Sequence, residues 1–176
     1  AGVGTNGGTI AFNVSENNWL GQGKKLNFQI ELDQESLSGT INFTDPNYDF
    51  LGNSLNYFVS SSTNDKPDQG YENKIINAGL NTTFEQFKDI YATLGVSASY
   101  DDLKTDNLAS STLKKQSGTF NEIAGLYGFK YDGRNRAFMP TSGSVVSFNQ
   151  SVPIFADRKS ISNTFTMSRY KSINEN

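Results

Sequence analysis

The feature that most constrains this chain is a strict alternation of apolar and polar residues. In its clearest segment, residues 26–33, every even position is apolar and every odd position is polar. The apolar residues of this segment are Leu26, Phe28, Ile30 and Leu32. A helix would scatter them around its circumference, whereas a strand collects them on one face because its side chains have a period of two. The pattern therefore predicts a strand with one apolar face.

The same alternation recurs along the chain, and we expect about ten strands. The predicted strands lie at residues 1–5, 9–17, 24–33, 36–44, 54–62, 74–84, 89–101, 119–131, 144–155 and 160–171. The further predicted apolar faces are Ile10, Phe12 and Val14; Gly39, Ile41 and Phe43; Ala78, Leu80 and Thr82; Ile90, Ala92, Leu94, Val96 and Ala98; Ile123, Gly125, Tyr127, Phe129 and Tyr131; and Phe165 and Met167. Most of these strands are about 9–12 residues long, which is the length that a tilted strand needs to cross a bilayer.

Composition narrows the class of protein. The chain has 176 residues, which fits a single domain, 1–176. It contains no apolar run long enough for a membrane-spanning helix and no secretory signal peptide. Cysteine and histidine are both absent, so we expect no enzyme activity, no cofactor and no metal site. The net charge of −3 gives no reason to expect nucleic acid as a partner.

The predicted connections differ in length on the two sides of the sheet. Short connections are expected at Gly7-Gly8, 18–23, 34–35 and 156–159. Long polar ones are expected at 62–73 and 102–118, with a possible helical turn within 102–113. If the strands run up and down, both long loops fall on one side, as in outer-membrane barrels. A soluble β-sandwich also alternates, but we expect more charge on its polar face than the Asn, Ser, Thr and Gly found here. We therefore predict an antiparallel transmembrane β-barrel of about ten up-and-down strands, partial or reduced in size.

Two motifs are explained without a ligand. Residues 2–7 match the G-x-G-x-x-G string of dinucleotide sites, but a strand follows them where that fingerprint needs a helix. Asp101, Asp102 and Asp106 do not have the spacing of a calcium loop, and an ordinary solvated loop accounts for them. Neither motif predicts a binding site.

Three turn motifs occur in order between predicted strands. Residues 16–23 read Glu-Asn-Asn-Trp-Leu-Gly-Gln-Gly, residues 44–52 read Thr-Asp-Pro-Asn-Tyr-Asp-Phe-Leu-Gly, and residues 132–143 run from an Asp-Gly-Arg start to a Pro-Thr-Ser-Gly end. Proline cannot donate a ladder hydrogen bond and glycine can take a positive φ, so these stretches suit tight connections. The residues that we single out in them are Trp19, Leu20, Gly21, Asp45, Pro46, Asp132, Arg134, Pro140, Thr141 and Gly143.

With these three motifs, the chain resembles the BamA-like barrel-assembly family of outer-membrane proteins. The resemblance covers nearly the whole chain, as roughly the first ten strands of a barrel that has about sixteen in the family. The periplasmic POTRA domains, the Val-Arg-Gly-Phe motif of a long outer loop and the C-terminal aromatic signature are absent from the sequence. The resemblance implies a location in the bacterial outer membrane of a Gram-negative organism. It also leads us to expect a fragment, an engineered reduction or part of a larger barrel.

The resemblance implies that the first strand belongs to a lateral gate, and we take Gly2, Val3 and Gly4 as its candidate positions. Glycine weakens strand pairing, so a client strand could add to such an edge. A frayed chain terminus explains the same glycines. The implied partners are the lipid bilayer, nascent outer-membrane proteins, and further barrel strands from another chain or a second copy.

Three alternative functions stay open at this stage. A passive small barrel with no assembly activity would use the same strands. A two-partner secretion pore belongs to the same superfamily, but would need POTRA domains and a plug helix. An outer-membrane protease or lipase would need histidine, which the chain lacks.

Overall fold

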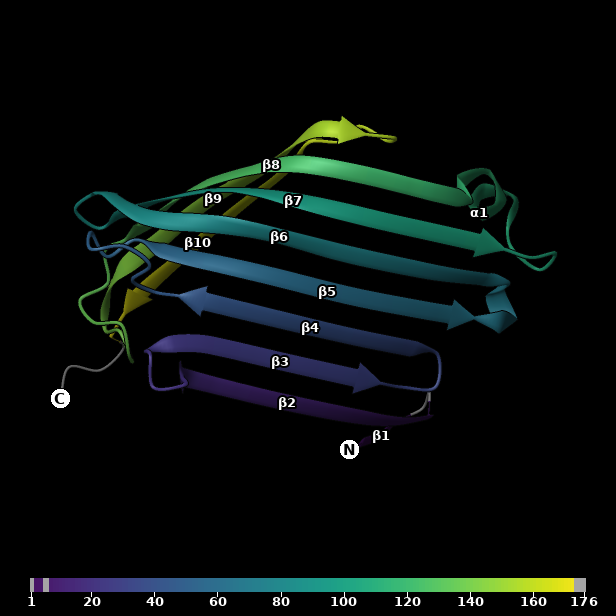
Figure 1. Ribbon diagram of the computed structural model, residues 1–176, viewed down its shortest axis with the longest axis horizontal. Coiled ribbons are helices and arrows are strands. Elements are labelled where there is room, and N and C mark those ends of the chain that lie inside the picture. The colour runs from purple at the N-terminus through teal and green to yellow at the C-terminus, as the bar shows by residue number, and fades with distance from the viewer. Residues whose placement is uncertain (1, 5–6, 173–176) are drawn as a thin grey trace.

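The computed structural model describes residues 2–4 and 7–172, and side chains from residue 8 onward. Its ten strands form one antiparallel sheet in sequence order, with each strand hydrogen-bonded to the next (Figure 1). The strands are β1 (Gly2–Gly4), β2 (Gly7–Trp19), β3 (Lys24–Leu32), β4 (Ser36–Asp45), β5 (Ser54–Lys66), β6 (Tyr71–Phe87), β7 (Ile90–Thr105), β8 (Gly118–Asp132), β9 (Ser142–Ala156) and β10 (Ser162–Lys171). The expected all-β, up-and-down fold is thus confirmed.

Two expected connections were wrong, and a third has other bounds than expected. Gly7 and Gly8 are not a turn, because they pair with Gly4 and Val3 as the start of β2. The connection expected at 62–73 shrinks to 67–70, since β5 and β6 continue past the apolar part of the hairpin. The long connection after β7 is confirmed, but it covers 106–117 rather than 102–118.

Two short helices occur among the described residues, both in these connections. A 3₁₀ turn, η1 (Pro67–Gln69), joins β5 to β6, and α1 (Ser111–Gln116) lies between β7 and β8. The helical turn expected within 102–113 therefore lies later in the chain. In the part of the chain that the structure describes, neither helix has the length or apolar character to cross a membrane.

The strand register places the predicted apolar faces on one side of the sheet. Phe28 pairs with Ile41, Ile41 with Val59, Val59 with Ala78, and Ala78 with Ala98, so these outward positions form one row. Further rows continue this face from Ile10 on β2 to Met167 on β10. Since few large apolar side chains are buried anywhere in the described chain, this continuous face is the main apolar surface, and it is exposed.

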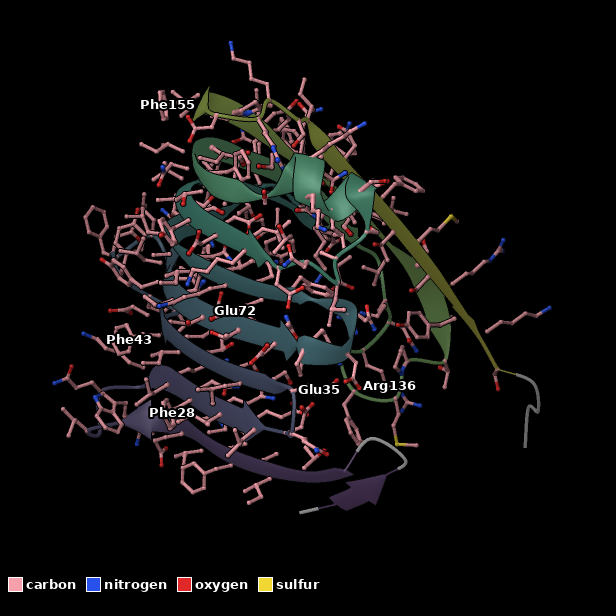
Figure 2. All side chains as sticks on the ribbon, turned by 90° about the vertical axis from the view of Figure 1, so that its right-hand side faces the viewer. Phe28, Glu35, Phe43, Glu72, Arg136 and Phe155 are labelled. Atoms are coloured by element: carbon pink, nitrogen blue, oxygen red, sulfur yellow. The ribbon has the colours of Figure 1, made fainter. Side chains whose placement is uncertain are left out.

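Crowding at glycines identifies the other, polar face as the concave one. A Cβ on Gly79 would lie 2.6 Å from the Phe58 ring, and one on Gly95 would lie 2.6 Å from the Leu80 carbonyl oxygen. A Cβ on the apolar-face Gly39 would have its nearest neighbour at 3.9 Å. Figure 2 shows the sheet curved, with Phe28 and Phe43 on the outside of the curve. The polar residues therefore line the inside, as in a membrane barrel.

Candidate functional site: the free edges and the turn rim

The N-terminal edge of the sheet is weakly covered. β1 contributes only three residue pairs, Gly2 with Thr9, Val3 with Gly8 and Gly4 with Gly7. β2 is 13 residues long, so its segment 10–19 has no strand on that side among the described residues. The candidate gate positions Gly2, Val3 and Gly4 thus lie at this edge. Most of the edge that a further strand could reach belongs to β2.

The C-terminal edge is formed by β10. All ten of its residues pair with β9, and in the described part of the chain no strand covers its other side. β1 and β10 are therefore the two ends of an open, curved sheet (Figures 1 and 2). In lipid, the unpaired N–H and C=O groups of such edges need partners because hydrocarbon offers none.

The apolar face crosses the strands obliquely, as the wall of a tilted barrel requires. Phe28, where the row of paired outward residues begins, lies near the middle of the apolar segment of β3, residues 26–32. The same row ends at Ile123, which lies at the end of the apolar segment of β8, residues 123–131. The centre of the band thus moves by five residues over five strands. At about 3.4 Å per residue and 4.8 Å per strand, the strands tilt by about 35°, within the range for membrane barrels.

The apolar band differs in depth between strands and is shallow at both free edges, as it also is on the interior strand β5, where Leu55, Tyr57 and Val59 precede Ser61. On β8 five consecutive outward positions, from Ile123 to Tyr131, are Gly or apolar and aromatic residues, which span about 22 Å of membrane depth at this tilt. On β2 the band has only Ile10, Phe12 and Val14 before Glu16, or about 11 Å. On β10 it has Phe165 and Met167, or about 6 Å. Because hydrocarbon is about 25–30 Å thick, the bilayer must thin beside these strands or expose polar groups.

The first turn motif closes the hairpin of β2 and β3. Trp19 is the last residue of β2, and Leu20 and Gly21 form the turn with φ of 53° and 72°. The Asn18 side-chain oxygen accepts a 2.7 Å hydrogen bond from the backbone N–H of Gly23. A Cβ on Gly21 would have open space around it, so the positive φ alone explains this glycine.

The second turn motif joins β4 to β5 and is linked to the first. Asp45, the last residue of β4, lies 3.4 Å from the ammonium of Lys24, which begins β3. Its carboxylate also accepts a 3.2 Å hydrogen bond from the N–H of Asn47, across Pro46. The carboxylate of Asp49 accepts the backbone N–H groups of Leu51 and Asn53 at 3.0 and 3.1 Å. The motif therefore organises the turn through its two aspartates.

The third turn motif, between β8 and β9, has the densest contacts. Arg134 donates from Nε and from a terminal nitrogen to the two carboxylate oxygens of Asp132, at 2.7 and 2.6 Å. This hydrogen bonding to Asp132 raises the pKa of Arg134 above its usual value, so the pair stays charged. Arg134 also donates to the carbonyl oxygen of Ala137 at 3.2 Å. Asp132 in turn donates its N–H to the carbonyl of Asp89 in the neighbouring turn, at 2.9 Å.

One residue that the sequence analysis did not single out, Asn135, holds the far side of this turn. Its amide nitrogen donates to the Thr141 hydroxyl at 2.8 Å, and its oxygen accepts the N–H groups of Thr141 and Ser142 at 3.1 and 3.2 Å. Pro140 precedes these contacts, and Gly143 has a φ of 102° with its α-carbon against the backbone of Gly133. An asparagine five residues before a Pro-Thr pair carries no signal of such a role.

The two arginines of this turn should differ in their effect on stability. Arg134→Ala removes two short bonds to a largely covered carboxylate, so we expect a measurable loss of stability. Arg136 makes one 2.7 Å bond to the carbonyl of Met139, and Arg136→Ala should cost less than about 0.5 kcal/mol. Urea unfolding in detergent, followed by circular dichroism, compares the two variants. Equal losses would contradict the central role of the Asp132 pair.

Among the described residues, neither the end of the sheet that carries the three turn motifs nor its two free edges have a group of side chains suited to bind a metal. Among residues 2–4 and 7–172, no three acidic side chains gather as a metal site would need. The features that stand out are instead the two open edges, the thin apolar band beside them, and the linked turns that fix the hairpin registers.

Comparisons with known proteins agree with this geometry. A family model described as the Omp85 superfamily domain matches residues 18–176. Among solved structures, the chain is similar to the crystal structure of BamA from Haemophilus ducreyi lacking POTRA domains 1-3, with 20% sequence identity and a TM-score of 0.73. The match covers 96% of this chain and 36% of that one, so this chain spans about a third of its length. At this identity the likeness shows the fold, a BamA-like barrel wall that is not closed.

Proposed function

Because the chain belongs to the Omp85 superfamily, we propose that it forms part of the barrel wall of an outer-membrane protein assembly factor. In this proposal it lies in the outer membrane of a Gram-negative bacterium. The β1–β2 edge accepts strands of nascent outer-membrane proteins, and Gly2, Val3 and Gly4 are the gate positions that release this edge. Catalysis is by strand pairing and membrane thinning, without covalent chemistry, a cofactor or a metal.

The observation that carries the proposal is the glycine content of the pairing between β1 and β2. Three residue pairs, two of which include Gly2 or Gly4, hold β1 in place. Glycine contributes no side-chain packing and loses more backbone freedom than other residues when it is ordered. An incoming strand can pair with segment 10–19, which no described strand covers on that side. Weak pairing at the glycines of β1 therefore favours strand addition at this edge.

The shallow apolar band on β2 supports the same edge as the site of insertion. A bilayer that thins to meet Ile10–Val14 offers a client hairpin less hydrocarbon to cross. The band is shallower still on β10, so band depth does not favour the β1–β2 edge. The glycine-containing pairing of β1 with β2 is what favours the N-terminal edge.

The test measures folding of an unrelated eight-stranded barrel into liposomes that contain the chain. Heat-modifiable gel mobility gives the folding half-time, and we expect it to fall several-fold relative to empty liposomes. Unchanged half-times would favour the passive barrel and contradict assembly activity.

A second measurement identifies which of the two free edges, that of β2 or that of β10, captures the client strand. The chain has no natural cysteine, so Ser15→Cys on β2 and Thr166→Cys on β10 each give one thiol. Both positions belong to the polar face of a free-edge strand, which makes them a matched pair. We expect a client with a cysteine in its last strand to form a disulfide mainly with Ser15→Cys. Preferential capture by Thr166→Cys would overturn the assignment of the β1–β2 edge.

A further inference from the structure

A chain of hydrogen-bonded polar side chains crosses the apolar, outward face of β8, β9 and β10. The Tyr127 hydroxyl donates to the side-chain oxygen of Gln150, and the Gln150 amide donates to the side-chain oxygen of Asn163. The register places these three residues opposite one another on adjacent strands. Apolar outward neighbours surround them, including Phe129, Phe148 and Phe165.

These polar groups lie within or directly beside the apolar band. Tyr127 is the third of the five outward positions from Ile123 to Tyr131, so it lies near the middle of the band on β8. The band moves by about one residue per strand, which keeps Gln150 near its centre on β9. On β10, Asn163 is the outward position next to Phe165, at the end of the short band. Hydrocarbon at this depth supplies no hydrogen-bond partner.

The direction of the hydrogen bonds leaves an unused donor at the sheet edge. Asn163 accepts from Gln150 through its oxygen, and within the described residues its amide nitrogen has no acceptor. Asn163 is exposed, and no described strand pairs with the outer edge of β10. A polar side chain inside a membrane is costly unless it is paired, and commonly marks a functional contact. The missing partner is therefore an acceptor that arrives from beyond β10.

We propose that the Tyr127–Gln150–Asn163 chain fixes the register of a β-strand that pairs with the free edge of β10, and that this strand presents an outward hydrogen-bond acceptor opposite Asn163. Because side chains alternate between faces, a one-residue slip would turn the acceptor inward and leave the Asn163 amide unpaired in lipid. A single polar position can specify register in this way. The proposal concerns the edge opposite the one used for assembly, and does not depend on assembly activity.

The test uses ten-residue peptides, the length of β10, that differ only opposite Asn163, where they carry Gln or Leu. Each peptide has a cysteine opposite Ser168, and the full chain in detergent or bilayers carries Ser168→Cys as its only thiol. We expect disulfide capture of the Gln peptide to be about threefold to tenfold faster, the ratio that one hydrogen bond provides.

Two variants separate the proposed contact from general edge pairing. Asn163→Leu should abolish the preference for the Gln peptide, and Thr164→Val, on the opposite face, should keep it. If Asn163→Leu fails to fold by heat-modifiable mobility, Gln150→Leu provides the same test, since it removes the side chain that orients Asn163. Equal capture of both peptides by the chain with its natural Asn163, or a preference that survives loss of Asn163 or Gln150, would overturn the proposal.

Discussion

Replacing Gly143 by alanine should destabilise the chain by about 3–5 kcal/mol, among the largest effects expected of a point substitution. The new Cβ would lie 2.1 Å from the carbonyl oxygen of Gly133 and 2.8 Å from the α-carbon of Arg134. Both are backbone atoms, so rotation of a side chain cannot relieve the clash. The φ of 102° at this position adds strain for any residue with a Cβ.

The clash would also break contacts that depend on this geometry. Gly133 donates its N–H to the carbonyl of Ser144 at 2.9 Å, directly beside the close contact between Gly133 and Gly143. If the two backbones separate, this bond and the Asp132–Arg134 pair next to it lose their alignment. The effect should therefore exceed that of Arg134→Ala.

Gly21→Ala is the matched control, because it places a methyl group on a turn glycine at the same end of the sheet. Its φ of 72° is also positive, but no atom lies within 4 Å of the new Cβ. We expect a loss of about 1 kcal/mol, the usual cost of a left-handed conformation. The midpoint of urea unfolding, followed by circular dichroism, compares the variants. Similar losses for the two would show that backbone contact at Gly143 is not the cause.

The strands and their faces can be predicted from the sequence because a membrane barrel requires apolar and polar residues to alternate along each strand. Leu26, Phe28 and Ile30 alternate with polar residues since one side meets lipid and the other the polar interior. All seven predicted apolar faces lie on the same side of the sheet once the register is known. The order of the ten strands follows from the short connections between them.

The same pattern fails where strands leave the apolar band. Ser62 to Lys66 on β5 pair with Tyr71 to Ile75 on β6, although neither segment alternates clearly. Backbone hydrogen bonds to the adjacent strand maintain this extension, and such pairing makes no demand on side-chain polarity. The polar segment 62–73 was therefore expected to be a loop.

Contacts between residues that are distant in the sequence could not be predicted, for a different reason. Tyr127, Gln150 and Asn163 lie on three strands, and each is unremarkable in its own segment. Their juxtaposition depends on the pairing register of β8, β9 and β10, including the irregularity between Ile123 and Ala124. The turn motifs, in contrast, are local in sequence, and the structure places all three of them at one end of the sheet, on the left in Figure 1.

A second large effect is expected at Gly79, on the concave face. Phe58 lies opposite Gly79, and its ring covers the glycine so closely that a new Cβ would lie 2.6 Å from it. The ring could turn away, but the carbonyl oxygen of Val96 lies 2.7 Å from the same point and belongs to the backbone. Gly79→Ala should therefore separate β6 from β7 locally and cost about 2–3 kcal/mol.

Gly39→Ala is the control on the convex face. Its Cβ would have one neighbour, the carbonyl oxygen of Gln29, at 3.9 Å. Alanine also restricts the unfolded chain more than glycine does, so we expect no loss, or a gain of up to about 1 kcal/mol. Equilibrium unfolding in the same detergent gives both values.

The contrast between these two glycines tests the orientation of the whole wall. Curvature brings side chains together on the inside of a sheet and separates them on the outside, so only inward glycines should resist a methyl group. A Gly79→Ala loss that is partly recovered in the Phe58→Leu, Gly79→Ala double variant would support Phe58 as an inward residue that covers the glycine. If Gly39→Ala were the more damaging change, the apolar face could not be the convex one. The assignment of that face to lipid, and with it the depth of Asn163 in the membrane, would then have to be abandoned.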